Sequence, residues 1–128
     1  MRLDHAGRFL WAFHGTSVSS SLRYMAWMGD VENTVLYGST TLPVSHPVHV
    51  QELAFVSPGV IGTTTVTLHR NRVTSPLESH VVTGTVAGAW SKVVVASTFF
   101  IGDEITVGVD HSGSSIDVSG YISGVYLQ

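Results

Sequence analysis

Short apolar segments recur along the whole chain, and turn-forming residues such as glycine, asparagine and proline separate them. The clearest segment runs over Thr63–Arg70, where Val66 and Leu68 share one face and His69 lies on the other. An alternation with a period of two residues predicts a half-buried antiparallel strand. The next two residues, Asn71–Arg72, predict a turn or a bulge.

The whole chain contains nine candidate segments of this kind, about eight of which we expect to be strands, with no long helical segment between them. In order they are Arg8–His14, Leu22–Met28 (a strand or a helical turn), Thr34–Tyr37, Val44–Val56, Thr63–Arg70, Glu78–Val86, Ser91–Thr98, Glu104–Asp110 and Ile116–Leu127. In the last segment the apolar alternation changes phase at Gly120, where we expect a β-bulge.

Valine, serine, threonine and glycine supply 62 of the 128 residues, a mixture that favours strands and tight turns over helices. We therefore expect an all-β fold, an antiparallel two-sheet β-sandwich of the jelly-roll kind with about eight strands. Residues 1–128 form a single domain in this prediction, since no segment has the composition of an interdomain linker. Residues 1–21, which end in a polar serine-rich segment, either belong to the sandwich or form an N-terminal arm.

The charge balance narrows the classes of partner. Six basic residues stand against nine acidic ones, a net charge of −3, so no dense basic face can form. We therefore expect neither nucleic acid nor an anionic membrane as a partner. No apolar run approaches the roughly eighteen residues of a membrane span, and the first residues lack the pattern of a secretory signal. The absence of cysteine excludes a disulfide framework and a thiolate site.

The chain contains residue types that can bind metals or catalyse reactions, but their spacing matches no metal-binding or catalytic motif. Of the seven histidines, His46 and His49 are close, but Pro47 between them excludes a helix that could bring them to one face. Asp110-His111-Ser112 cannot align as a catalytic triad, because sequence neighbours in one turn cannot adopt that geometry. We therefore expect no metal site, no cofactor, no catalytic residue and no enzymatic activity.

Three groups of residues are candidates for contacts instead. An aromatic set in the N-terminal part predicts either core packing or a subunit interface: Phe9, Trp11, Phe13, Tyr24 and Trp27. The one local basic cluster predicts either a solvated turn or a loop that contacts a partner: His69, Arg70 and Arg72. Trp90, after the small residues 87–89, is the candidate aromatic platform for a sugar.

The C-terminal half, from about residue 63, resembles the trimeric modules of the C1q/TNF-like group. Three runs carry the resemblance: Val66–Asn71, Phe100–Val107 with its Gly-Asp turn, and the closing segment Gly120–Leu127. Small jelly-roll proteins of tailed-phage virions, including head decoration proteins and tail-fibre tips, are similar in the same way. The N-terminal half lacks the aromatic landmarks of an animal C1q domain, and the chain has no cysteine, so we expect the phage group.

This resemblance implies a non-catalytic virion structural protein that is made in the host cytoplasm and ends up in the virion. The expected role is that of a capsid decoration or cement protein, which binds and stabilises the phage shell as a homo-oligomer, a trimer by the resemblance. Its partners would be copies of itself and capsid or other virion proteins. The alternative is a receptor- or carbohydrate-binding module of a tail fibre, in which Trp90 would contact the sugar.

Overall fold

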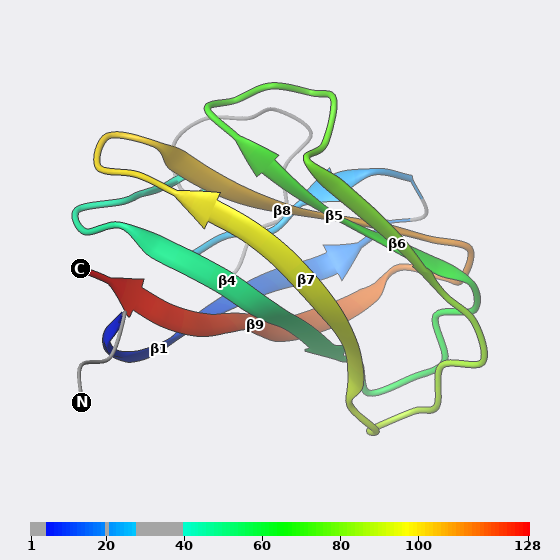
Figure 1. The fold of residues 1–128 in the computed structure, drawn as a ribbon. Coiled ribbons are helices and arrows are strands. Elements are labelled where there is room, and N and C mark those ends of the chain that lie inside the picture. Colours follow the sequence, from blue (N-terminus) through cyan, green and yellow to red (C-terminus); the bar gives the residue numbers. More distant parts are fainter. Residues whose placement is uncertain (1–4, 20, 28–39) are drawn as a thin grey trace.

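The computed structural model, drawn in Figure 1, describes residues 5–19, 21–27 and 40–128. These residues form nine strands and no helix, and the strands assemble into two antiparallel sheets. The predicted all-β, two-sheet sandwich is therefore confirmed. No helix capable of spanning a membrane occurs in the part of the chain that the structure describes.

The strands vary in length from 2 to 14 residues. In chain order they are β1 (His5–Val18), β2 (Arg23–Tyr24), β3 (Leu42–Pro43), β4 (Val48–Val56), β5 (Thr64–Arg70), β6 (Glu78–Val82), β7 (Ser91–Phe99), β8 (Glu104–His111) and β9 (Ile116–Leu127).

The order of the strands is that of a jelly roll. The first sheet has the order β1-β9-β4-β7, and the second has the order β2-β8-β5-β6, with the short β3 also paired to β8. If β3 is set aside, the first strand pairs with the last, the second with the seventh, the third with the sixth and the fourth with the fifth. This is the pairing of a long antiparallel hairpin wrapped into two sheets.

The core lies between the two sheets and is built from the inward-facing residues of both. The first sheet supplies aromatic and aliphatic side chains such as Phe13, Leu53 and Phe55, and the second supplies mostly valine, leucine and isoleucine. Burial of these side chains away from water is the main favourable contribution to folding. Because the inner faces of the two sheets form the core, contacts with other molecules must use the outer faces of the sheets or the loops at the two ends of the sandwich.

The N-terminal segment is part of the sandwich. Residues 5–18 of the candidate arm form β1, which pairs with β9 along its length, and Phe9 and Phe13 are buried in the core. The strand continues past Gly15 into the serine-rich segment, and a register shift between Gly15 and Val18 marks a β-bulge there. Ser17 lies in this bulge with φ of 52°.

The bulge predicted at Gly120 is absent. A glycine stands at this inward position because the ring of Phe13 packs closely against it. Gly120 pairs in continuous register with Phe13 on one side and Phe55 on the other. Val118, Gly120 and Ile122 all face the core, so the alternation keeps its phase through the glycine. A Cβ atom at Gly120 would lie 2.4 Å from Cζ of Phe13, which shows why an apolar side chain is missing at this inward position.

Other predicted segments are shortened or lie elsewhere. Within its described residues 22–27, the predicted segment Leu22–Met28 contributes β2 and an isolated bridge between Ala26 and His14. Strand β4 begins directly after Pro47, which cannot donate to a ladder. The predicted strand Thr34–Tyr37 lies outside the described residues.

Candidate contact surface

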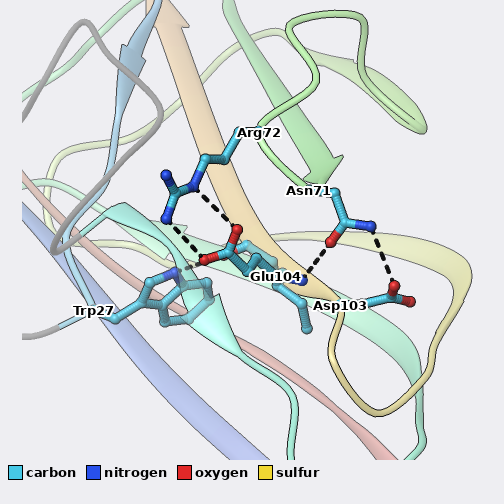
Figure 2. Close-up of polar contacts among 6 residues, drawn as sticks. Trp27, Asn71, Arg72, Asp103 and Glu104 are labelled. Carbon is cyan, nitrogen blue, oxygen red and sulfur yellow. Dashed lines mark hydrogen bonds and ion pairs between the residues drawn. The ribbon is translucent and has the colours of Figure 1, made fainter.

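One end of the sandwich is formed by two connections that are hydrogen-bonded to each other, the β5–β6 loop and the β7–β8 turn; we call it the turn end. Asn71 joins them, as Figure 2 shows. Its backbone N–H donates to the carbonyl oxygen of Glu104 at 2.9 Å, and its side-chain Oδ1 accepts from the backbone N–H of Glu104 at 2.7 Å. The amide Nδ2 donates to Oδ1 of Asp103 at 3.2 Å. The two connections therefore form one rigid unit.

The β5–β6 loop begins with a tight turn of left-handed residues. Asn71 and Arg72 have φ of 55° and 61°, and the N–H of Val73 donates to the carbonyl oxygen of Arg70 at 3.1 Å. Positive φ at both central positions is the geometry of a type I′ turn. Asparagine tolerates this conformation, but an arginine in it is uncommon.

The side chain of Arg72 is held in place although about half of it is exposed. Its Nε and Nη2 atoms donate to the two carboxylate oxygens of Glu104 at 3.0 and 3.1 Å (Figure 2). At the next residue of β8, Trp27 donates its indole N–H to the carbonyl oxygen of Ile105 at 3.0 Å. A two-bond arginine–carboxylate pair fixes the guanidinium plane as well as its position.

The β7–β8 turn presents two large apolar side chains to water. Asp103 closes the turn, since its N–H donates to the carbonyl oxygen of Phe100 at 2.9 Å and its Oδ2 accepts from the N–H of Phe100 at 2.9 Å. Gly102 has φ of 92°, as the third position of a type II turn requires. Phe100 and Ile101 remain 58% and 70% exposed. On the adjacent β5–β6 loop, Val73 is also exposed.

The predicted basic loop is mostly integrated into the fold. His69 lies in β5 and is fully buried, so its side chain does not contact solvent. Its Nδ1 donates to the carbonyl oxygen of Val73 at 2.9 Å, and its ring lies 5.4 Å from that of Tyr24. Desolvation by burial lowers the pKa of His69, against a smaller opposite effect of the bond to Val73.

Arg70, the second residue of the predicted loop, contacts residues of β7 and of the β7–β8 turn. Its guanidinium forms an ion pair with Asp103 at 3.4 Å, donates to the carbonyl oxygen of Thr98 and lies over the ring of Phe99. Of the three predicted residues, Arg72 therefore offers the most accessible cationic group.

The aromatic N-terminal set divides into two parts. Phe9, Phe13 and Tyr24 are buried within the chain, so their side chains pack inside the sandwich. Trp11 and Trp27 are half-buried and line an apolar groove of about 330 Å³ together with Leu10, Ala12 and Leu42. None of these lining residues is ionisable. Trp11 and Trp27 thus remain candidates for a contact between subunits.

Trp90 is half-exposed, at 51%, on the side of the first sheet that faces away from the core. Its indole packs against the ring of Tyr121 in β9, with the centroids 5.5 Å apart. An accessible aromatic ring is what the predicted sugar platform requires.

The histidine side chains that the structure describes are engaged singly rather than as a group. Their partners are hydroxyl, carbonyl or carboxylate oxygens, as for His14 with Ser119 at 2.7 Å and His80 with Glu78 at 2.9 Å, and His111 also accepts the backbone N–H of Gly113. Within residues 5–19, 21–27 and 40–128 no three histidine or acidic side chains gather as ligands for a metal ion.

Phe100 and Ile101 are exposed candidates for contact that the sequence patterns did not single out. Two bulky apolar residues directly before a Gly-Asp turn are the available signal, because such a turn places its first residues at the surface. The chain matches no protein-family model and no curated protein.

Proposed function

We propose that this chain is a non-catalytic virion structural protein, a decoration protein that binds and stabilises the capsid of a tailed phage as an oligomer. The observation that carries the proposal is the turn end, where a hydrogen-bonded turn exposes Phe100 and Ile101 and the connected β5–β6 loop holds the guanidinium of Arg72 on Glu104. The jelly-roll strand order supports it, since capsid and lectin domains commonly use this architecture.

The composition of the turn end suits a protein partner. Aromatic residues and arginine are enriched at the centres of protein interfaces, where they contribute most of the binding energy. Phe100 and Arg72 supply one of each, and Ile101 extends the apolar area. The turn end is already ordered by Asn71 and Asp103, so docking would order few additional groups. A rigid apolar contact of this kind is what a protein that reinforces a shell requires.

The groove next to β1 supports binding rather than catalysis. Its lining contains tryptophan, leucine and alanine and no group that could act as a general acid, base or nucleophile. In the proposal, Trp11 and Trp27 contact a second copy of the chain through this groove, and three copies form the decoration unit. Apolar grooves with half-buried tryptophan are common at subunit contacts.

Two measurements test this function. Light scattering coupled to size exclusion determines the oligomeric state of the purified protein, for which we expect a trimer. Co-sedimentation with undecorated shells of the phage that encodes the chain should then remove the protein from the supernatant. A monomer that stays entirely in the supernatant would refute both parts of the proposal.

The carbohydrate-binding alternative concerns Trp90, which lies on a different surface from the turn end. Carbohydrate binding at Trp90 and shell binding at the turn end would therefore use different residues.

A further inference from the structure

Three residues that are distant in sequence meet on the outer face of the first sheet. Tyr121 in β9 pairs with Ala54 in β4, and two residues earlier on the same side of β4 lies Glu52. Trp90 directly precedes β7, the next strand of this sheet, and packs against Tyr121. We call Trp90, Tyr121 and Glu52 the aromatic–carboxylate site.

Tyr121 connects the other two members. Its hydroxyl donates to Oε1 of Glu52 at 2.6 Å, and its ring is inclined by 51° to the indole of Trp90. The second carboxylate oxygen, Oε2, has no hydrogen-bond partner among the described residues. The tyrosine hydroxyl has one proton, which it donates to Glu52, and its oxygen can still accept a hydrogen bond through a lone pair.

Short side chains lie beside Tyr121 on β1 and β9. Ala12 lies opposite Tyr121 on β1, and Ser119 and Ser123 flank Tyr121 on the same side of β9. Trp90 is half-exposed, and Glu52 and Tyr121 are partly exposed. The site therefore combines one flat apolar group, the indole of Trp90, with two hydrogen-bond acceptors, the carboxylate of Glu52 and the hydroxyl oxygen of Tyr121.

We propose that the aromatic–carboxylate site binds a pyranose sugar. A pyranose ring has an apolar face of C–H groups and a rim of hydroxyl donors. Trp90 would receive the C–H face, while Oε2 of Glu52 and the hydroxyl oxygen of Tyr121 would accept hydrogen bonds from neighbouring hydroxyl groups. Polar groups of this kind fix the orientation of a small ligand beside an apolar contact.

The size of the site favours a sugar over a protein. A stable protein interface buries about 800 Å² on each partner with an apolar centre. Here Trp90 supplies the one exposed indole, and Glu52, Ser119 and Ser123 beside it are polar. The exposed aliphatic side chains of Val94, paired with Glu52, and Leu10, paired with Ser123, extend the apolar area only modestly. This binding does not require the shell-binding role, because Phe100 and Arg72 take no part in it.

The test is saturation-transfer NMR and tryptophan fluorescence on the full chain. The probes are the methyl α- and β-pyranosides of glucose, galactose and mannose, and N-acetylglucosamine. We expect at least one of them to bind with a dissociation constant in the millimolar range, on the order of 1 mM, as a single exposed contact allows. Trp90→Ala should abolish binding, and Glu52→Gln should weaken it about tenfold, because a neutral acceptor replaces a charged one.

The control is Val60→Ser, which changes an exposed valine in the loop between β4 and β5 and should leave sugar binding unchanged. Thermal unfolding of each variant confirms that it is folded. The inference is wrong if no probe binds at concentrations up to about 50 mM, or if Trp90→Ala binds sugar as the unchanged protein does. It is also wrong if Trp90→Ala prevents co-sedimentation with shells while no sugar binds, because the face would then be a protein contact.

Discussion

The ring of Phe13 in β1 occupies the space that a side chain at Gly120 in β9 would need. The two residues are directly paired, and a Cβ at Gly120 would lie 2.4 Å from the ring of Phe13 and 2.3 Å from the carbonyl oxygen of Ala54. The glycine thus admits an aromatic side chain of the N-terminal strand into the core. This contact ties β1 to the sandwich and explains why the segment is a strand rather than an arm.

We predict that Gly120→Ala lowers the free energy of unfolding by about 3 kcal/mol, because the added methyl group overpacks the core next to an immovable backbone carbonyl. Urea unfolding followed by tryptophan fluorescence measures this loss. Ser123→Ala, on the outer side of the same strand, is the control and should change stability by less than about 0.5 kcal/mol. Equal stability of the two variants would show that Phe13 can move away from Gly120 at no cost.

A second prediction separates the hydrogen bonds of Asn71 from its backbone conformation. Asn71→Ala loses both side-chain bonds to the β7–β8 turn and places alanine at positive φ, so we expect a loss of about 2 kcal/mol. Asn71→Gly loses the same bonds but adopts positive φ freely, so it should be the more stable of the two variants. If the alanine variant is as stable as the glycine variant in urea unfolding, the left-handed conformation of residue 71 is not what constrains this turn.

A third prediction concerns the pH dependence that His69 introduces. Burial lowers the pKa of His69 in the folded state, so below the ordinary histidine pKa the unfolded chain binds a proton that the folded chain resists. The contribution of this histidine to stability is therefore complete above about pH 6.5 and is lost as the pH falls through the lowered value. The free energy of unfolding should fall between pH 7.5 and 5.5, by at most about 1.4 kcal/mol per pH unit from this group. The test is urea unfolding across this range, and His69→Gln should flatten the curve. A variant with the unchanged slope would assign the pH dependence to other groups.

A fourth prediction concerns Glu78, which joins the open edges of the two sheets. From β6 its Oε2 accepts the backbone N–H of Ala96 at 2.9 Å and the hydroxyl of Ser97, both in β7. We expect Glu78→Ala to lower the free energy of unfolding by about 2 kcal/mol, since hydrogen bonds to a charged acceptor are lost. Amide hydrogen exchange at Ala96 should also become faster. Ser79→Ala, its exposed neighbour, is the control.

The pH dependence of the Glu78 contribution has the same sign as that of His69. Burial raises the pKa of Glu78, but the hydrogen bonds from Ser97, Ala96 and His80 together lower it below its ordinary value. The contribution of Glu78 is therefore present above the ordinary carboxyl pKa and is lost as the pH falls through the lowered one. If Glu78→Ala is destabilising to the same extent at neutral and strongly acidic pH, the carboxylate charge is not what holds the edge.

Local patterns were sufficient to predict the fold class and most strands. The alternation in residues 64–70 and 104–111 follows from a core on one side, and both segments are strands with the expected inward valines and leucines. The same pattern placed His69 on an exposed face. The ring of Tyr24 covers His69, and a contact between residues 45 positions apart leaves no local signal in the sequence.

The candidate sites show the same division between local and long-range information. The turn at Asn71–Arg72 and the accessible Trp90 could be predicted from local residue types. The ion pair of Arg72 with Glu104 and the bond of Tyr121 to Glu52 depend on strand register. Register is decided by the packing of both sheets, so these partners emerge only in three dimensions.

The central claim, that the turn end binds the shell, is tested most directly by co-sedimentation of the double variant Phe100→Ser/Ile101→Ser with undecorated shells. Both side chains are largely exposed, so the variant should keep its stability within about 0.5 kcal/mol. We predict that it loses shell binding by at least about a hundredfold, as removal of two central apolar contacts implies, while Val60→Ser binds as the unchanged protein does. Equal binding of the double variant and the unchanged protein would contradict the account.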